Sequence, residues 1–328
     1  MILIFKTTLA RPTISTSRLI YIILLVSFSC DTFNSIAQTN PESSSKKIIK
    51  HQIEFRHDND FLLLTDRYYS SGLFLSYRKR LENGFFNSGD EQLSFTIGQE
   101  VITPSDVKTE IISELDRPYV GFLGLSGEWS YFKNDGGVEA RFLIGVAGRA
   151  SGAGGVQRWY HNAVVVADPP AWVGEMENSI HFNMYVSYLY EWHLTPNPFS
   201  VYIAARPEVS YGTRDIYFYP ELVAYFGRRN PTASSMAHNR IGSTDREIFF
   251  AIRGGYRFVG YNGLLEGNAL GDNSILLVTP NKSVIYAGFD FQHRYGQNEY
   301  WFGFRLNSAE SERTKPHKYL ILSYKRNF

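Results

Sequence analysis

Polar side chains that can bind a metal ion lie close together in the first hundred residues of the chain. The stretch His57-Asp58-Asn59-Asp60 supplies carboxylate and amide oxygens, and Ser70 follows at the start of the next apolar segment. Hard cations such as Ca²⁺ prefer oxygen ligands of these kinds. Asp and Asn are also common turn residues at the ends of strands. The stretch therefore indicates either a calcium site or an ordinary turn.

A second group of chemically capable residues lies near the middle of the chain. Gln157 and His161 are four residues apart, and Trp172 follows them. Histidine is the natural general base near neutral pH, although a single loop histidine can also be structural. The sequence has no Gly-x-Ser-x-Gly elbow, no paired-histidine zinc motif and no phosphate-binding glycine loop. Serine-hydrolase and zinc-hydrolase functions are therefore poorly supported. Between the two groups, residues 103–108 offer one available cation, Lys108.

The elements that position these residues are predicted to be β-strands. The chain is 44% hydrophobic, 16% aromatic and 20% charged, with a formal net charge of +1. After residue 30 no apolar run approaches the ~20 residues that a membrane helix needs. The high apolar content argues against disorder, and the lack of a basic excess argues against nucleic-acid binding. A soluble β-rich protein and a membrane protein built from alternating strands remain.

Alternation of apolar and polar residues recurs at strand length through the chain. From Phe182 to Trp192, for example, every second residue is apolar, and the residues between include Asn183 and Glu191. We predict twelve strands, at residues 51–58, 70–81, 91–102, 118–132, 137–149, 180–194, 199–212, 215–228, 245–261, 281–296, 298–309 and 317–328. An even number of antiparallel strands suits a closed transmembrane β-barrel of the outer membrane, with apolar residues toward lipid and polar residues toward the lumen.

This alternation also predicts where the candidate metal ligands point. If Glu54 faces the lumen, Asp58 and Asp60 face it too, whereas Asn59 points outward. The same parity places Ser70 on the lumenal face of the next strand.

The two ends of the chain fit an exported barrel. Residues 1–37 have basic residues, a short apolar core and small residues before Gln38, so they are predicted to be a signal peptide. Cys30 offers an alternative lipoprotein cleavage site. Residues 38–50 then form a short periplasmic leader, and residues 51–328 form the barrel with external active-site loops. The final strand is amphipathic and ends in Phe328, as in outer-membrane barrels.

The connections between the predicted strands alternate in length. Tight turns are expected on the periplasmic side, and long loops are expected outside. The turns lie at 134–136, 195–198 and 295–298, and the long loops at 59–69, 103–117, 150–179 and 262–280. The segment 229–244 breaks this pattern, because it is long and falls on the periplasmic side. The sequence gives no reason for it.

The polar motifs occur in an order that resembles one known family. They are Asn59-Asp60, Thr65 through Gly72, Thr103-Pro104-Ser105, Asp116-Arg117-Pro118-Tyr119, and Gln157 through His161 to Trp172. In order and approximate spacing they resemble the lipid A 3-O-deacylase family, and the similarity is clearest from residue 53 to residue 210. That family forms twelve-stranded outer-membrane barrels that hydrolyse the 3-position acyl ester of lipid A with calcium.

The resemblance implies roles for individual residues. His161 would be the catalytic histidine, Ser70 would take the place of the family's threonine, and Lys108 would be an active-site lysine. Arg67, Gln157 and Trp172 are expected to contact the substrate. Asn59 and Asp60 match the family's pair near Ca²⁺, and the doubled aspartate leaves Asp58 and Asp60 as alternative ligands.

The function implied is removal of a 3-linked acyl chain from lipid A of lipopolysaccharide, in the outer membrane of a Gram-negative bacterium. The active site would face the cell exterior, the partners would be lipopolysaccharide and outer-membrane lipids, and a monomer is expected. Alternatives are a non-enzymatic barrel, as a narrow pore or structural protein, and an outer-membrane phospholipase with a nucleophilic serine. A soluble β-sandwich is the remaining structural alternative.

Overall fold

The computed structural model describes residues 49–328, apart from positions 61, 62, 64, 66, 87, 88, 166, 167, 196 and 198. The predicted signal peptide and nearly all of the predicted leader lie outside the described residues. Among the described residues, no helix is long and apolar enough to cross a membrane.

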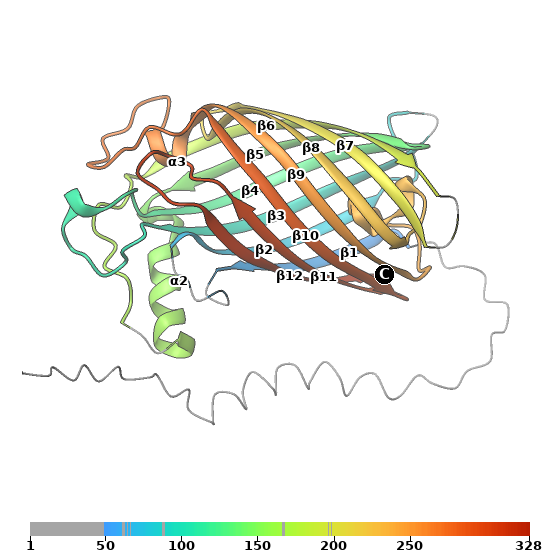
Figure 1. The fold of residues 1–328 in the computed structure, drawn as a ribbon, viewed down its shortest axis with the longest axis horizontal. Coiled ribbons are helices and arrows are strands. Elements are labelled where there is room, and N and C mark those ends of the chain that lie inside the picture. The colour runs from blue at the N-terminus through green and yellow to red at the C-terminus, as the bar shows by residue number, and fades with distance from the viewer. Residues whose placement is uncertain are drawn as a thin grey trace, which may run out of the picture. The chain divides into compact units, whose positions relative to one another are not determined.

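The described chain forms a closed antiparallel barrel of twelve strands, as predicted (Figure 1). Each strand pairs with its neighbours in sequence, and β1 closes the sheet against β12. The strands are β1 (His51–Asn59), β2 (Tyr68–Arg80), β3 (Asp90–Thr103), β4 (Val120–Lys133), β5 (Gly136–Ala147), β6 (Ser179–His193), β7 (Ser200–Gly212), β8 (Asp215–Arg228), β9 (Glu247–Asn262), β10 (Ser283–Tyr295), β11 (Asn298–Asn307) and β12 (His317–Asn327).

All twelve predicted strands are present, and only their ends differ from the prediction. The fifth strand, for example, ends at Ala147 and not at residue 149. Gly148 has φ of 86°, in the left-handed region that favours glycine, and this conformation ends the strand.

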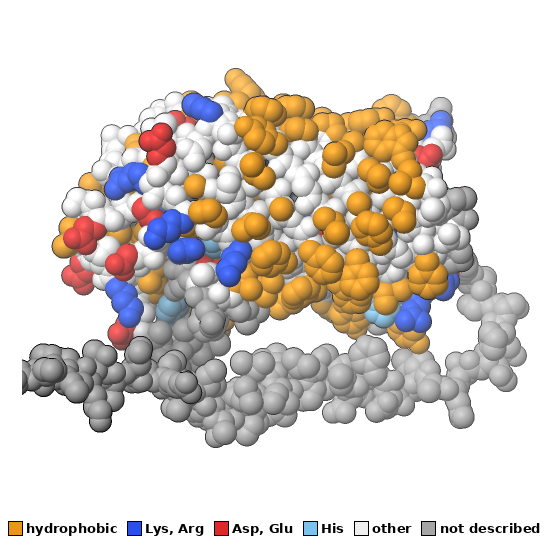
Figure 2. Space-filling model, viewed as in Figure 1, with side chains coloured by type: hydrophobic (Ala, Val, Ile, Leu, Met, Phe, Trp, Pro, Cys, Tyr) orange, Lys and Arg blue, Asp and Glu red, His pale blue; other side chains and the backbone are white. Residues whose placement is uncertain are grey.

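The predicted alternation is visible along β6. Phe182, Met184 and Trp192 are exposed on the outer surface, whereas Asn183 and Glu191 are buried on the lumenal side. Figure 2 shows hydrophobic side chains forming a broad band across the face of the barrel in view, with charged side chains concentrated beyond its two margins. Such a band is the surface that a bilayer covers, because lipid-facing and lumen-facing residues alternate in membrane barrels.

The two ends of the barrel differ. We call one the loop end, because it carries the long connections 60–67, 104–119, 148–178, 263–282 and 308–316. These connections contain the short helices η3 (Ile112–Glu114), η4 (Arg149–Ser151), α2 (Ala153–Tyr160), η5 (His161–Val165) and α3 (Gly263–Glu266). The other is the turn end, where the C-terminus lies (Figure 1).

Charged residues fill much of the lumen in ion pairs. Arg78 lies 2.6 Å from Glu54, and Arg253 contacts both Glu221 and Asp290 at 2.9 and 2.8 Å. Buried charges require such partners, because an unpaired ion in a low-dielectric interior is costly. A polar cavity of about 560 Å³ remains in the lumen.

The unexplained segment 229–244 folds into the turn end of the lumen, and we call it the plug. It contains two short helices, η6 (Thr232–Ser234) and η7 (Met236–His238), and many of its side chains are buried. Asn239 lines the lumenal cavity, so the plug forms part of the cavity wall on that side.

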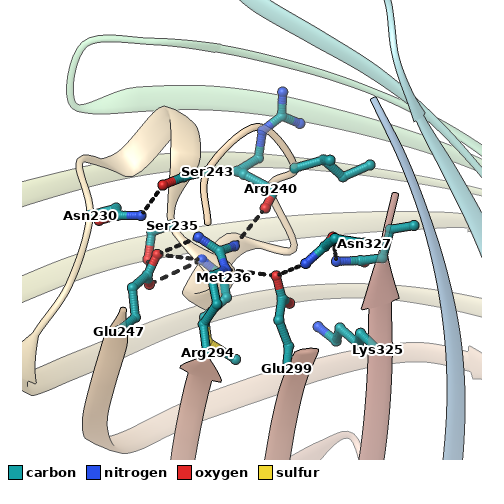
Figure 3. Close-up of polar contacts among 12 residues, drawn as sticks. Asn230, Ser235, Met236, Arg240, Ser243, Glu247, Arg294, Glu299, Lys325 and Asn327 are labelled. Atoms are coloured by element: carbon teal, nitrogen blue, oxygen red, sulfur yellow. Dashed lines mark hydrogen bonds and ion pairs between the residues drawn. The ribbon is translucent and has the colours of Figure 1, made fainter. Parts of the chain in front are cut away.

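Arg294 of β10 fixes the plug to the barrel wall (Figure 3). Its guanidinium donates to Glu247 and Glu299 at 2.8 Å each, and to the backbone carbonyls of Ser234 and Arg240 at 3.0 Å. Glu247 also accepts hydrogen bonds from the plug, at the hydroxyl of Ser235 and the backbone N–H of Met236. A single buried arginine therefore joins two strands to two points on the plug.

Further ion pairs hold the plug on other sides of the barrel. Arg229 donates to Glu191 of β6 at 2.8 Å, and Arg240 donates to Asp90 of β3 at 2.8 Å. The plug is thus tied to strands on several sides of the barrel and occupies the turn end of the lumen.

We expect Arg294→Met to loosen the plug. The substitution leaves Glu247 and Glu299 buried without their shared cation, and breaking a buried pair in this way typically costs about 3–5 kcal/mol. Single-channel recordings in planar bilayers should show higher ion conductance than the parent barrel. Arg246→Gln, at an exposed position beside the plug, is the matched control. A variant that still shows a heat-modifiable barrel but stays electrically silent would contradict this role.

Candidate active site at the loop end

The end of the β1–β2 hairpin holds the Asp60 carboxylate in a fixed position. The Asp60 backbone N–H donates to the carbonyl of Ser70 at 3.2 Å, so these two residues face each other across the hairpin. Asp60 Oδ2 accepts from the Thr65 hydroxyl at 2.9 Å and from the Arg67 backbone N–H at 3.0 Å. Asp60 is fully buried. The structure therefore brings Asp60, Ser70 and Arg67 together.

A β-bulge at Ser70 changes the alternation that the sequence predicted. The pairing of β2 with β3 shifts between Tyr69 and Ser71, which makes Ser70 the extra residue. Tyr69 consequently lines the lumenal cavity, on the side that simple alternation assigned to Ser70. Bulges re-aim side chains and are frequent next to active sites.

Asp58 and Asp60 have different surroundings. Asp58 lines the lumenal cavity, and its Oδ2 accepts from Arg56 at 3.0 Å and from the Tyr69 hydroxyl at 2.9 Å. These contacts make Asp58 part of the lumenal charge network. Asp60, held by hydroxyl and backbone N–H groups, is the better placed of the two for a role at the loop end. Asn59 lies between them and is also buried.

Helix α2 is anchored by the predicted substrate-binding pair. Gln157 Oε1 accepts from the indole N–H of Trp172 at 2.8 Å, and the Trp172 ring stacks on Tyr119 at 5.2 Å. A Cβ at Gly154 would lie 3.1 Å from the Trp172 ring, so glycine permits this close approach. Ala153 packs into the same apolar cluster. Gln157 and Trp172 therefore position the helix, whatever contact they also make with a substrate.

His161 follows α2 by one residue and is buried, with 6% of its surface exposed. It lies four residues after Gln157, and residues with this spacing share one face of a helix. The His161 backbone N–H donates to the carbonyls of Gln157 and Arg158, so His161 continues the helical turn on the side of α2 that carries Gln157.

Lys108 lies on the loop that packs against this assembly. The carbonyl of its neighbour Val107 accepts from the Tyr119 hydroxyl at 3.0 Å and from the Ala171 backbone N–H at 3.1 Å. The Lys108 side chain is exposed, and it makes no ion pair within the described part of the chain. The structure thus places Lys108 beside the α2 assembly without fixing its ammonium group.

Tyr68 joins the hairpin to this loop, a role that sequence reasoning missed. Its hydroxyl donates to Asp116 at 2.8 Å and accepts from the backbone N–H of Lys315 at 2.8 Å. Asp116 in turn accepts from the Ser105 N–H at 2.9 Å. The φ of Tyr68 is 60°, which is rare for a residue with a side chain and is often found at functional sites. The position of Tyr68 in the Thr65–Gly72 motif was the one sequence signal that indicated this residue.

The oxygen atoms at the hairpin are of the chemical types that bind a hard cation. Asp60, Asn59 and Ser70 offer carboxylate, amide and hydroxyl oxygens, which Ca²⁺ prefers. Among the described residues, no group of three or more His, Cys, Asp or Glu side chains could hold a metal ion. A calcium ion at this hairpin would therefore depend on Asp60 together with neutral oxygens.

Glu175 is a second residue without a predicted role. It forms a β-bridge with Tyr119, and its carboxylate lies 3.5 Å from the guanidinium of Arg149. Burial raises the pKa of Glu175 from 4.5 to about 7, and the nearby Arg149 only partly opposes this effect. Glu175 therefore titrates near neutral pH, next to the residue on which Trp172 stacks.

We expect the 148–178 loop to open more readily as pH rises from about 4.5 to about 7. The closed loop binds the Glu175 proton more tightly than an open loop does, so the stability that this proton confers is present at low pH and is lost as pH rises through the pKa of about 7. Hydrogen exchange at the Met176 amide, which donates to Tyr119 at 2.9 Å, reports the opening. Glu175→Gln should abolish the pH dependence. Equal pH dependence in parent and variant would refute the assignment.

The chain matches a family model and several solved structures over most of its length. The family model described as "Outer membrane protein LpxR" matches residues 20–328. LpxR from Salmonella typhimurium has a TM-score of 0.73 and 19% identity, covering 84% of this chain and 100% of that chain. The β domain of the Bordetella autotransporter BrkA has a TM-score of 0.42 and 9% identity, covering 85% and 99%. None of the curated proteins compared with the chain matches it.

The solved structure of LpxR has the same barrel fold, and the family model extends over nearly the whole sequence. The chain therefore belongs to the LpxR family of outer membrane proteins, which confirms its resemblance to the lipid A 3-O-deacylases.

Proposed function

We propose that this barrel hydrolyses the 3-linked acyl ester of lipid A in the outer membrane, at the loop end. The observation that carries the proposal is the joining of two distant segments at one rim. The β1–β2 hairpin brings Asp60 and Ser70, α2 brings His161, and the hydrogen bonds of Tyr68 connect the hairpin to the loop on which α2 packs. This rim borders the apolar band (Figure 2).

The position of the rim suits a lipid substrate. An acyl chain can remain beside the apolar band while its ester group reaches the polar loops. Lipid A is the anionic glycolipid of the outer leaflet, so the loop end faces the cell exterior in this proposal. The turn end, which holds the plug, then faces the periplasm.

In the proposed reaction His161 acts as the general base. One imidazole nitrogen takes a proton from water as the water oxygen attacks the ester carbonyl carbon. The carbon–oxygen bond of the ester then breaks, and the imidazolium returns the proton to the departing alcohol oxygen. The products are a free fatty acid and the 3-hydroxyl group of the glycolipid. The Ser70 hydroxyl and the Lys108 ammonium stabilise negative charge on the ester oxygen or a lipid phosphate.

Calcium is part of this proposal. Asp60, with Asn59, would hold the ion, and bound Ca²⁺ supplies positive charge that stabilises the developing oxyanion. Asp58 is the less favourable alternative, because Arg56 and Tyr69 already engage its carboxylate.

Two observations bear on the rival functions. The plug, which Arg294 holds in the lumen, argues against a function as an open pore.

A phospholipase of the serine type needs a serine beside its histidine, and Ser179 Oγ lies 3.0 Å from His181 Nε2. His181 is fully buried, and neither residue lines the lumenal cavity. Substitution of Ser179 therefore serves as a control that separates the serine mechanism from the mechanism proposed for His161.

His161→Gln should lower the release of fatty acid from purified lipid A by about 10²–10⁴-fold, the usual contribution of a general base. The assay uses lipid A in detergent micelles with the refolded, heat-modifiable barrel. Ser179→Ala should retain parent activity. If His161→Gln is fully active, or if Ser179→Ala is inactive and the parent reacts with a serine-directed phosphonate, the proposed chemistry is wrong.

Asp60→Asn should weaken calcium binding, because it removes the carboxylate while preserving shape. Ca²⁺ that binds the folded barrel raises its thermal unfolding temperature, and a chelator reverses this. We expect the calcium-dependent shift to disappear in Asp60→Asn and to persist in Asp58→Asn. The opposite pattern would assign the ion to Asp58. No shift in the parent protein would remove calcium from the proposal.

A further inference from the structure

We propose that Arg67, Lys315 and Lys318 form a binding site for a phosphate group of the glycolipid substrate. We call these three residues the rim patch. The inference deepens the function proposed above and rests on it, because it names how the substrate is recognised. It concerns a surface beside the hairpin that holds Asp60, distinct from His161 and Lys108.

Tyr68 lies beside two of these basic residues. The guanidinium of Arg67 lies 5.6 Å from the centre of the Tyr68 ring. The backbone N–H of Lys315 donates to the Tyr68 hydroxyl at 2.8 Å. Residues far apart in the sequence therefore flank the same tyrosine, at the position where β1 has ended and β12 approaches β2.

Lys318 extends the patch to the edge of the apolar band. On β12 it pairs with Leu306 of β11, an exposed apolar residue. Its neighbour His317 points inward, where its ring nitrogen contacts the Tyr69 carbonyl at 3.0 Å, so Lys318 points outward. Leu322 and Tyr324 lie further along the same exposed face. Figure 2 shows Lys and Arg side chains, together with Asp and Glu side chains, between the apolar band and the loop end.

The cations of the patch lack the partners that neutralise other cations in the protein. Most lumenal arginines have carboxylate partners, as Arg78 and Arg253 do. Arg67, Lys315 and Lys318 make no ion pair with any described residue, and Arg67 Nε is buried without a hydrogen-bond partner among them.

The acidic residues in the same loop do not cancel this charge. Glu310 is held by Arg117 at 3.1 Å, which leaves Glu312 as the exposed acid of the loop. Two further carboxylates near Tyr68, those of Asp60 and Asp116, already accept hydrogen bonds from hydroxyl and backbone N–H groups. The three basic side chains therefore have no carboxylate ion-pair partner among the described residues and can accept an anion.

The location identifies the anion as a lipid phosphate. Lysine ammonium groups bind phosphate well, and long basic side chains at the edge of an apolar surface lie at headgroup level. A ligand bound at the headgroup level can keep its acyl chains in the bilayer beside Leu306 and Leu322. The phosphates of a phosphorylated glycolipid are at that level.

Binding at the patch would position the substrate for the reaction. The backbone N–H of Arg67 donates to Asp60 Oδ2 at 3.0 Å, so the patch and the proposed catalytic hairpin share a residue. A phosphate held there fixes the sugar headgroup beside Asp60 and Ser70. The patch is thus expected to determine affinity for the substrate more than the rate of the chemical step.

The test compares phosphorylated lipid A with lipid A whose phosphates have been removed. Binding is measured by native mass spectrometry of the full barrel carrying His161→Gln, so that no turnover occurs. We expect the barrel to prefer phosphorylated lipid A. The double variant Lys315→Gln/Lys318→Gln should lose about 25-fold in affinity for it, since each lysine near an anionic lipid surface contributes about fivefold. Binding of the dephosphorylated lipid should change less than twofold.

Lys282→Gln is the matched control, since Lys282 is an exposed loop-end lysine outside the patch. In the catalytically intact barrel, the double variant should raise KM with little change in kcat. Equal binding of the two lipids by the parent, or an unchanged preference in the double variant, would overturn the proposal. The double variant could abolish the preference for phosphorylated lipid A while the parent barrel releases no fatty acid. That result would support the patch and refute the proposed hydrolysis.

Discussion

The seam between β1 and β12 is the contact on which the rest of the structure depends. A sheet inside a bilayer must satisfy every backbone N–H and C=O group internally, and only closure removes its edges. Eight residue pairs, from Gln52 with Asn327 to Asn59 with Leu320, form this seam. Closure fixes which residues face lipid and which face the lumen. It also places the end of β1, with Asn59 and Asp60, next to the start of β12.

Closure of the barrel also buries the charged residues of the lumen, which is energetically unfavourable unless they are paired. Polar residues on the inner face are withdrawn from bulk water, so their charges must be paired. The ion pairs of Arg78, Arg253 and Arg294 meet this requirement, and the Arg294 pairs also hold the plug. The protein thus has the hydrogen-bonded plug at one end and an array of longer loops at the other. Tyr68, Asp116 and Trp172 order these loops into one rim.

Much of the fold could be predicted from the sequence, because alternation is a local signal. The twelve strands, the outward face of β6 and the lumenal position of Asp58 all follow from a period of two. The plug could not be predicted, because its partners Glu191 and Arg294 lie on strands distant in sequence. The bulge at Ser70 could not be predicted either, since one extra residue shifts the pairing without any change in composition.

Only part of the candidate active site could be predicted from the sequence. The order of the polar motifs indicated which residues belong together, but the contacts of Tyr68 and the burial of Glu175 depend on tertiary packing. The central claim is that the ordered rim hydrolyses lipid A, and mass spectrometry of lipid A from cells tests it most directly. Cells that produce the protein should contain lipid A lacking its 3-linked acyl chain, and cells producing His161→Gln should not. Identical lipid A in both, with the barrel correctly folded in the outer membrane, would contradict the account.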